Sequence, residues 1–458
     1  MRGFLKTFLI VIIVAVLAAG STACFFIFQP KKLESLAFVP PKAQNLRDLV
    51  RQAVKRSEQL TIEGVKALEM RDIKGAIQKF DEAVEIFPPS TEAYSYLVKI
   101  YLMGGQEDRM FDILEHSGHS YPSFDGIIRM IDNASLLKLP AVEDAQNVYI
   151  ARFKDNRKMA ISFMFDDGEE SVYRGILPIF EKYGFRATIP VIGAEVTASP
   201  GDPYRGSWSE WKDAANRGFE IASHSMHHRD AKTLTNADFK VEIDDVKAMI
   251  EKNVGKPVYT YVFPLDSYTD TIVNYALGAY EAIRVPFYLR KLYPQTTSLV
   301  YGGLSFSLET ANRIADIGIQ RRWWVIAECH GLQQENEKSY KPVTQDFLEG
   351  HLTYLKQRPA DVWVDTFHNI FQYVSARKTT TVERRDVAPG RADIVLHADV
   401  PNKALPVGLT VVLKTNGDAG AVSARADDGE VLRAWPCGTE NICVEMNACD
   451  RTAHVQWK

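Results

Sequence analysis

Two short groups of acidic and imidazole side chains stand out in this sequence. Asp166 and Asp167 are adjacent, and three of the ten histidines are His224, His227 and His228. Two imidazoles and one carboxylate can hold a divalent metal ion while leaving coordination positions open for water and a substrate. A second carboxylate beside that ion can take a proton from the water. The residue types therefore predict a metal-dependent hydrolase.

The remaining parts of such a site can also be found in the sequence. Histidines four residues apart, such as His224 and His228, can point both imidazoles at one ion. Zinc fits this ligand set, and iron, cobalt or manganese would also be held. His330 comes from a different stretch of chain, and we expect it to protonate the leaving amine as a general acid.

Each of these groups follows a short apolar run with the composition of a buried strand. The runs cover residues 159–165, 219–222 and 323–327, and further strands are expected at 258–263 and 362–367. Amphipathic helices separate them, which is typical of a parallel sheet or a β/α barrel. Because side chains at the carboxyl ends of barrel strands face one rim, we expect the acidic and imidazole groups to meet in one pocket.

One of the connecting helices is specified in some detail. Thr235 and Asp238 can cap its first turn, and Gly255 lies where it should end. Between them runs an apolar stripe of Phe239, Ile243, Val246 and Ile250. We expect this stripe to pack against the sheet.

Two motifs give the sequence a resemblance to a known family. Phe165-Asp166-Asp167-Gly168 and His224-Ser225-Met226-His227-His228 resemble the first two motifs of the polysaccharide deacetylases of the NodB-homology group, carbohydrate esterase family 4, over about residues 157–375. The resemblance implies an α/β fold with a distorted seven-stranded β/α barrel. It also implies that Asp166 is the base, that Asp167, His224 and His228 bind the metal, and that His330 is the acid. His227 is the competing second ligand.

The sequence departs from the family pattern at two places. The third motif usually begins with an arginine that orients the base, but Tyr261–Asp266 keeps only Pro264. If the match holds there, the backbone N–H of Leu265 would help to stabilise the oxyanion. Arg284 could replace the missing arginine, although a lone arginine more often forms a plain structural ion pair. The fourth motif, with its tryptophan, is not found.

The N-terminus has the properties of a membrane segment. Residues 7–30 carry no charge, and as a helix they would cover roughly 36 Å, enough to cross a hydrocarbon core of about 30 Å. We therefore expect segment 1–32 to be a single-pass anchor in the cell membrane, with the catalytic domain on the extracytoplasmic side. A secreted protein with a cleaved signal peptide, or a lipoprotein cut before Cys24, is the alternative.

Residues 33–140 are expected to form an α-helical segment. Gly64, Ala76, Phe80, Ala83 and Pro88 have the offsets of a tetratricopeptide repeat, although a plain helical hairpin explains them nearly as well. In either case the segment would serve as a spacer or as a docking surface for a protein partner.

The polysaccharide deacetylase domain is expected over residues 145–378, and a small accessory β-sandwich over residues 379–458. Alternating apolar runs broken by Pro and Gly predict the sandwich. Cys437, Cys443 and Cys449 allow one disulfide, which an exported protein can form.

Composition narrows the function further. The 458 residues carry 54 basic and 58 acidic side chains, so the formal charge of −4 gives no reason to expect a nucleic acid partner. The leading hypothesis is a membrane-anchored, metal-dependent deacetylase that hydrolyses N-acetyl groups of amino sugars in an envelope or exported polysaccharide. One alternative is a non-catalytic glycan-binding or scaffold protein of a polysaccharide synthesis system. Another is a hydrolase of a different amide or of an O-acetyl ester.

Overall fold

The chain forms two compact units, residues 1–137 and 138–458. The computed structural model describes residues 46–87, 93–94, 96–97, 100–101, 147–202, 204–284, 296–300, 307–333, 339–398, 407–415, 417 and 420–458. The membrane segment expected at 7–30 lies outside these residues. Of the helices that are described, none combines the length and the apolar character needed to cross a membrane.

The N-terminal unit contains a helical hairpin. Helix α2 (Leu46–Glu69) is followed by α3 (Ile73–Ile86), whose first turn is capped by Asp72. Phe80 of α3 is fully buried against Gly64 of α2, where a Cβ atom would lie 2.6 Å from the Phe80 ring. The missing side chain of Gly64 therefore lets the two helices approach. A hairpin is confirmed here, whereas the tetratricopeptide repeat stays a prediction.

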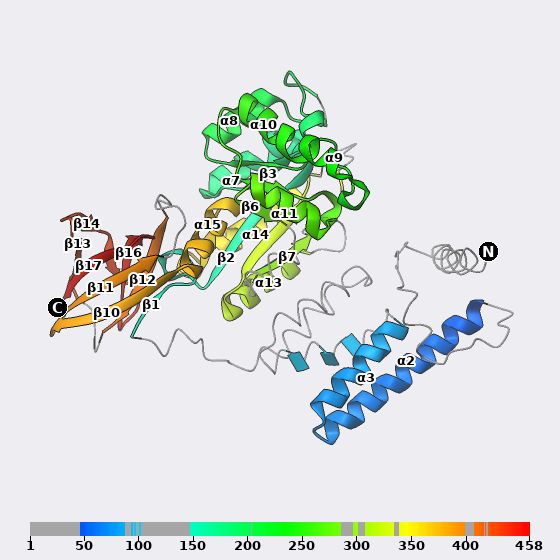
Figure 1. Ribbon diagram of the computed structural model, residues 1–458, viewed down its shortest axis with the longest axis horizontal. Helices are drawn as coiled ribbons and strands as arrows, with labels where there is room; N and C mark the ends of the chain where they lie inside the picture. The colour runs from blue at the N-terminus through cyan, green and yellow to red at the C-terminus, as the bar shows by residue number, and fades with distance from the viewer. Residues whose placement is uncertain are drawn as a thin grey trace. The chain divides into compact units, whose positions relative to one another are not determined.

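The second unit is built around a parallel sheet that is curled in space (Figure 1). Its strands run in the order β6-β5-β4-β3-β2-β8-β7, and β9 pairs with β2 off this path. The strands are β2 (Met159–Phe165), β3 (Thr188–Val191), β4 (Glu220–Ser223), β5 (Thr260–Val262), β6 (Ala282–Arg284), β7 (Thr296–Val300), β8 (Trp324–Cys329) and β9 (Val362–Val364). All of the pairings are parallel, as the alternation of strands and helices predicts.

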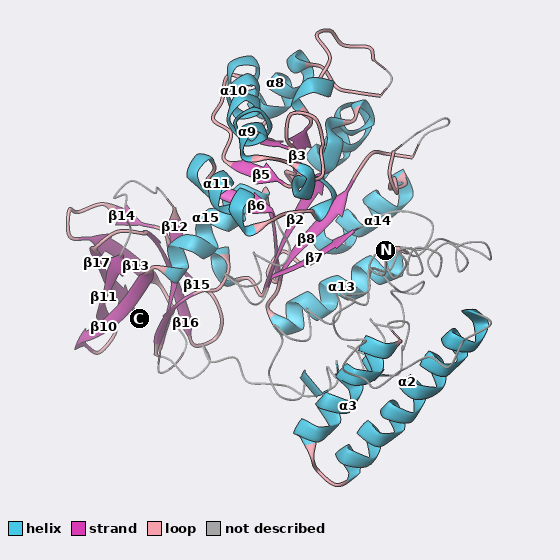
Figure 2. Cartoon of the chain, turned by 45° about the vertical axis from the view of Figure 1, so that its right-hand side comes forward, coloured by secondary structure: helices cyan, strands magenta, loops and turns pink. Residues whose placement is uncertain are grey.

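Helices connect these strands (Figure 2). They are α7 (Leu177–Tyr183), α8 (Trp208–Asn216), α9 (Asn236–Phe239), α10 (Val246–Val254), α11 (Asp270–Ala279), α13 (Leu308–Arg321), α14 (Gln345–Lys356) and α15 (Phe367–Lys378). The expected capping box of Thr235 and Asp238 is present, and Gly255 ends α10 in the left-handed conformation. Between α9 and α10 the chain passes through a π-helical segment, Lys240–Asp245, which the sequence pattern does not predict.

Among the described residues the parallel sheet has eight strands and runs from β6 to β7, so it is a curled half-barrel, called the barrel below, rather than the distorted seven-stranded barrel that the resemblance implies. Two antiparallel sheets accompany it. One has the order β10-β11-β17-β13-β14 and the other β1-β12-β16-β15. Their strands are β1 (Val148–Ile150), β10 (Thr380–Ala388), β11 (Arg391–Ala398), β12 (Gly408–Lys414), β13 (Val422–Ala426), β14 (Val431–Leu432), β15 (Ala434–Pro436), β16 (Asn441–Asn447) and β17 (Arg451–Trp457). Cys437 and Cys443 form a disulfide, and Cys449 is not part of it. Strand β1 comes from before the barrel, so the second sheet takes a strand that a C-terminal module alone would lack.

The barrel and the antiparallel sheets share one hydrophobic core. Buried residues of β2, β8 and α15 belong to the same cluster as those of β11, β12 and β16. The hydroxyl of Tyr373 on α15 donates to the carbonyl of Ala151 and accepts from the N–H of Thr410 on β12. These contacts fix α15 against the C-terminal sheets, and the first N–H groups of α15 donate to Thr188 at the start of β3 and to Glu220 at the start of β4.

Candidate metal centre

Asp166 and Asp167 lie immediately after β2, where the backbone turns sharply. Asp167 has φ +73° and Gly168 has φ +67°, which is the left-handed region that a residue other than glycine seldom adopts. The turn directs the two neighbouring carboxylates apart. Asp166 is buried beneath the site, whereas 17% of the Asp167 side chain is exposed.

The histidine motif forms a second tight turn after β4. Ser225 has φ +65° and His228 has φ +54°, and the N–H of His228 donates to Ser225 Oγ over 2.9 Å. Nδ1 of His224 lies 2.9 Å from the carbonyl oxygen of Val262 on β5. Because a carbonyl can only accept, Nδ1 carries the proton and the lone pair of Nε2 faces the carboxylates.

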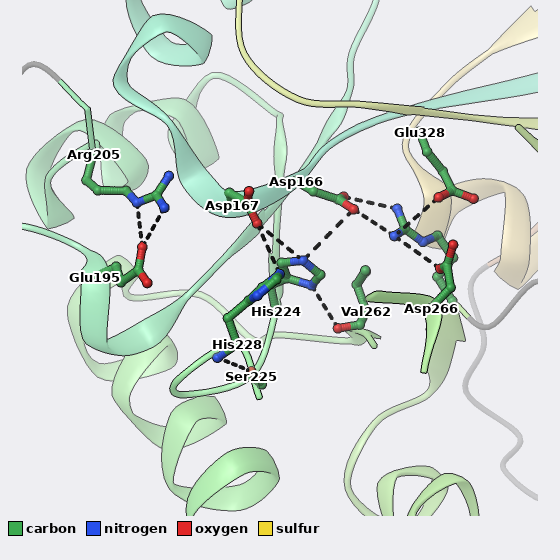
Figure 3. A network of polar contacts seen from close by, with 11 residues as sticks. Asp166, Asp167, Glu195, Arg205, His224, Ser225, His228, Val262, Asp266 and Glu328 are labelled. Atoms are coloured by element: carbon green, nitrogen blue, oxygen red, sulfur yellow. Dashed lines mark hydrogen bonds and ion pairs between the residues drawn. The ribbon is translucent and has the colours of Figure 1, made fainter. Parts of the chain in front are cut away.

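Asp167, His224 and His228 converge on one point, as Figure 3 shows. Nε2 of each histidine lies 3.5 Å from Asp167 Oδ1. One ligand atom from each residue can be chosen so that all three lie within 4.8 Å of one another. Asp167 Oδ1 is buried and has no hydrogen-bond partner within the described part of the chain. A buried carboxylate oxygen facing two imidazole nitrogens fits a divalent metal ion.

The protonation state of His224 agrees with binding of a metal ion. Burial lowers its pKa, and this effect outweighs the opposing charges of Asp166 and Asp167. The imidazole is therefore neutral at neutral pH, which is the form that binds a metal.

His227 is turned away from these three residues. Its Nδ1 lies 2.9 Å from Oε1 of Glu242, and half of the side chain is exposed. The other oxygen of Glu242 accepts hydrogen bonds from the backbone N–H groups of Met226 and His227. Glu242 is buried and thus fixes the histidine turn from below. The structure brings His228, rather than His227, to His224.

Arg284 supplies the arginine that the third motif lacks. It ends β6, and its guanidinium donates to both oxygens of Asp166, over 3.0 and 2.7 Å. Both side chains are almost completely buried. Burial alone would raise the pKa of Asp166, but opposing charges, that of Arg284 above all, lower it below its usual value. Arg284 therefore orients Asp166 and keeps it ionised.

Two more carboxyl groups surround the same guanidinium. Nη2 of Arg284 lies 3.6 Å from Glu328 and 3.7 Å from Asp266. One positive charge among three carboxyl groups favours retention of a proton by one of them. Desolvation, followed by the charge of Glu328, raises the pKa of Asp266 to about 8. Among these carboxyl groups, Asp266 therefore retains a proton more readily than Asp166.

Pro264 and Leu265 lie next to this group of charges. They form a turn with Asp266, in which Leu265 has φ +59° and Asp266 has φ +48°. Pro264 is buried, and the Leu265 side chain is 67% exposed. The contact of Asp266 with Arg284 places this turn beside Asp166. The oxyanion role of the Leu265 N–H stays a prediction.

His330 follows β8, two residues after Glu328. Its Nδ1 is buried and makes no hydrogen bond to any described residue. The charge of its protonated form contributes to the lowered pKa of Asp166. Cys329 beside it is buried, and burial raises the pKa of its thiol, which disfavours the thiolate needed for metal binding.

The sequence alone predicts no role for Asp266, Glu328 or Glu242, and it favours a plain structural ion pair for Arg284. A signal was present for Glu328, because it is a charged residue within an otherwise apolar strand. Glu242 likewise lies beside the apolar stripe of its helix. Such positions indicate a buried partner, but only the fold identifies it.

Comparison with known proteins agrees with the barrel motifs. The family model for polysaccharide deacetylase matches residues 153–279. That range contains the carboxylate pair and the histidine turn, whereas Arg284, Glu328 and His330 lie beyond it. This stretch of the chain is therefore similar to the polysaccharide deacetylases.

Similarity to individual proteins is distant. A gellan lyase of Bacillus sp is 24% identical over 262 residues, which cover 52% of this chain and 10% of that protein. YxkH of Bacillus subtilis (strain 168), assigned provisionally by its name to the polysaccharide deacetylases, is 24% identical over 28% of this chain and 45% of its own length. The chain thus spans less than half of either relative.

Among solved structures, a family 4 acetyl xylan esterase from Clostridium thermocellum in complex with a cobalt ion is 21% identical. The alignment covers 46% of this chain and 90% of that one, with a TM-score of 0.34.

Proposed function

We propose that this protein is a metal-dependent deacetylase that hydrolyses N-acetyl groups of amino sugars in an envelope or exported polysaccharide. One observation carries the proposal. Asp167 Oδ1 lies 3.5 Å from two imidazole nitrogens, beside a second carboxylate, Asp166, that Arg284 holds in a fixed orientation. This arrangement separates a metal-binding carboxylate from a proton-accepting one.

The residues around the site divide the chemistry between them. Asp167, His224 and His228 would hold the ion, which when bound would polarise the acetyl carbonyl and acidify a water molecule. Asp166 would accept the proton of that water as it attacks the carbonyl carbon. Its lowered pKa keeps it ionised and ready to accept.

Two further groups would act on the substrate. The backbone N–H of Leu265 would donate to the oxyanion of the tetrahedral intermediate. His330 would donate a proton to the leaving amine, which then departs as the free amino sugar. Zinc suits the ligand set, and iron, cobalt or manganese would also be accommodated.

The cellular location of the enzyme is part of the same proposal. The uncharged run at residues 7–30 would anchor the chain in the cell membrane with the catalytic domain outside the cytoplasm. The Cys437–Cys443 disulfide supports this location, since disulfides persist in oxidising compartments. The helical segment would then be available to a protein partner.

Acetate release tests the proposal directly. The full chain is incubated with a pentamer of N-acetylglucosamine after chelator treatment, with and without added zinc. We expect acetate only with the metal. Asp166→Asn should keep the metal and lose about 10²- to 10⁴-fold in rate, because it removes the proton acceptor without removing a ligand.

The outcomes distinguish the alternatives. Glycan binding without acetate release under any metal condition would favour the non-catalytic scaffold. Acetate release from an O-acetylated glycan, but not from the N-acetylated pentamer, would favour the ester hydrolase. Full activity of Asp166→Asn would contradict its role as base.

A further inference from the structure

Two exposed tyrosines lie on segments that border the metal centre. Tyr204 is 43% exposed and Tyr340 is 56% exposed, although most large aromatic side chains of the barrel are buried. An exposed aromatic ring at the edge of an active site offers a flat apolar surface to a ligand.

Tyr340 is fixed next to the predicted general acid. Its ring centroid lies 5.1 Å from that of His330, with the rings nearly perpendicular. The N–H of Gly331 donates to Ser339 Oγ over 2.7 Å, and the N–H of Val343 donates to the Gly331 carbonyl over 3.0 Å. The chain after His330 is therefore tied to the segment that carries Tyr340, and the position of the ring follows from the fold.

Tyr204 is tied to the other catalytic segment. Its carbonyl accepts from the N–H of Glu170 over 3.1 Å, and the N–H of Gly206 donates to the Gly168 carbonyl over 3.1 Å. The side chain of Asp202 fixes the turn by accepting from the N–H groups of Tyr204 and Arg205. In Figure 3 the neighbouring Arg205, paired with Glu195, lies on the Asp167 side of the site, opposite Asp266 and Glu328.

The two tyrosine-bearing segments are linked to the same stretch of chain. Residues 168–171 follow the carboxylate pair, and residues 204–206 bind to their backbone. From the chain after His330, the N–H of Leu332 donates to Ser171 Oγ over 3.1 Å, and Gly331 packs against the Glu169 carboxylate, which a Cβ atom would displace. The Tyr204 segment thus contacts the loop that follows Asp166 and Asp167 directly, and the Tyr340 segment is linked to this loop through Gly331.

We propose that Tyr204 and Tyr340 are ring-stacking positions for the sugars that flank the N-acetyl group to be cleaved. The inference rests on the proposed function and adds how a polymer would be held across the site. Pyranose rings present apolar C–H faces, and an aromatic ring can pack against such a face with little loss of side-chain entropy.

Binding to a protein that cannot turn over tests the inference separately from catalysis. The N-acetylglucosamine pentamer is titrated calorimetrically into the full chain carrying Asp166→Asn. We expect Tyr340→Ala and Tyr204→Ala each to weaken binding about tenfold, and Tyr340→Phe to stay within about twofold because it keeps the ring. Tyr275→Ala, which removes a 38% exposed tyrosine on α11, is the matched control and should bind normally.

Turnover supplies a second readout. In the otherwise unsubstituted chain, Tyr340→Ala should lower kcat/KM for the pentamer about tenfold more than for 4-nitrophenyl acetate, mainly through KM. A selective loss on the pentamer distinguishes lost stacking from a damaged fold, which would lower both activities together.

Several results would overturn the inference. These are pentamer binding unaffected by both alanine variants, Tyr340→Phe as weak as Tyr340→Ala, or no pentamer binding by the parent protein. Ring-dependent binding without acetate release would leave stacking intact and refute the proposed function. Acetate release from the pentamer that is insensitive to substitution of both tyrosines would refute ring stacking and leave the proposed function intact.

Discussion

The two ends of strand β4 differ in how their ionisable side chains are paired. Glu220 begins the strand, and its carboxylate accepts from the hydroxyls of Thr188 and Thr260 and from the N–H of His368. His224 follows the end of the same strand and faces carboxylates over 3.5 Å and 4.0 Å without a hydrogen bond to them.

Positive φ angles are more frequent at the carboxyl ends of the parallel strands. Of the described residues other than glycine, five have positive φ after β2, β4 and β5, namely Asp167, Ser225, His228, Leu265 and Asp266, against three before β2 and β8, namely Asp155, Asn156 and Arg322. Buried polar atoms without a hydrogen bond to a described residue gather at the carboxyl ends as well, on Asp167, Asp266, Arg284 and His330. Strain and unmet hydrogen bonds cost stability, and they persist where a ligand uses them. The amino end of β4 is therefore structural, and the carboxyl end is kept available for chemistry.

Removing a ligand at the carboxyl end should have the largest effect. His224→Ala is expected to lose the metal and about 10²- to 10⁴-fold or more of the acetate-releasing activity, since the ion and the water it activates are lost together. Metal content by elemental analysis and the acetate assay measure the two losses. His227→Ala is the control and should keep the metal, because Glu242 holds His227 away from the ligands. Equal metal loss in both variants would contradict the ligand assignment.

Arg284→Met should have the next largest effect. The two guanidinium hydrogen bonds that orient Asp166 are lost, and we expect activity to fall about 10- to 100-fold with the metal retained. Without the guanidinium, burial dominates and raises the pKa of Asp166. Because the base must be ionised, the acidic limb of the pH profile of kcat/KM should move to higher pH.

The pH profile and a conservative variant check this expectation. Arg284→Lys keeps the positive charge but cannot donate to both oxygens of Asp166 at once. It should therefore shift the acidic limb less than Arg284→Met does and still lose activity. An acidic limb that is unchanged in Arg284→Met would show that the arginine does not control Asp166.

At the amino end of β4, Glu220→Ala should lower the free energy of unfolding and leave the catalytic reaction of the folded enzyme unchanged. It leaves two buried hydroxyls and one backbone N–H without their acceptor, at a cost of about 2–4 kcal/mol in the free energy of unfolding. Urea unfolding measures the loss, and the pH profile of the folded enzyme should keep its shape. Glu281→Gln, which removes the half-exposed carboxylate paired with His368, should cost less than Glu220→Ala. A selective loss of metal in Glu220→Ala would contradict the division between the two ends.

The smallest effect is expected at a surface charge group of the C-terminal sheets. His454 lies between Asp393 and Asp427, at 2.7 and 2.9 Å, and these carboxylates raise its pKa above the usual value. Its stabilising contribution is therefore full below about pH 6.5 and is lost as the pH rises through the raised pKa. Half of the side chain is exposed, so solvent screening limits the contribution to less than about 1 kcal/mol.

Thermal unfolding at two pH values measures this contribution. His454→Gln should lower Tm more at pH 5.5 than at pH 9, whereas His397→Gln, at a more loosely paired surface histidine, should show little difference. A larger loss at the higher pH would refute the sign.

The sequence by itself determined the chemistry-bearing residues and the elements that carry them. The apolar run at 159–165 coincides with β2, and the capping residues Thr235 and Gly255 bound the predicted helix. These features are local, because hydrophobic period, caps and turn residues act within a few positions of the chain. The carboxylate pair and the histidine cluster could be recognised for the same reason.

Only the tertiary structure decided which charges meet. Arg284 and Asp166 are separated by 118 positions, yet they form a buried two-pronged contact. The pairing of His228 rather than His227 with His224 depends on positive φ angles and on Glu242, which reaches the turn from a helix. Strand β1 likewise joins a sheet formed by residues more than 250 positions away. Such contacts depend on the order and register of the strands in the sheet, which the pattern of residues along the sequence does not predict.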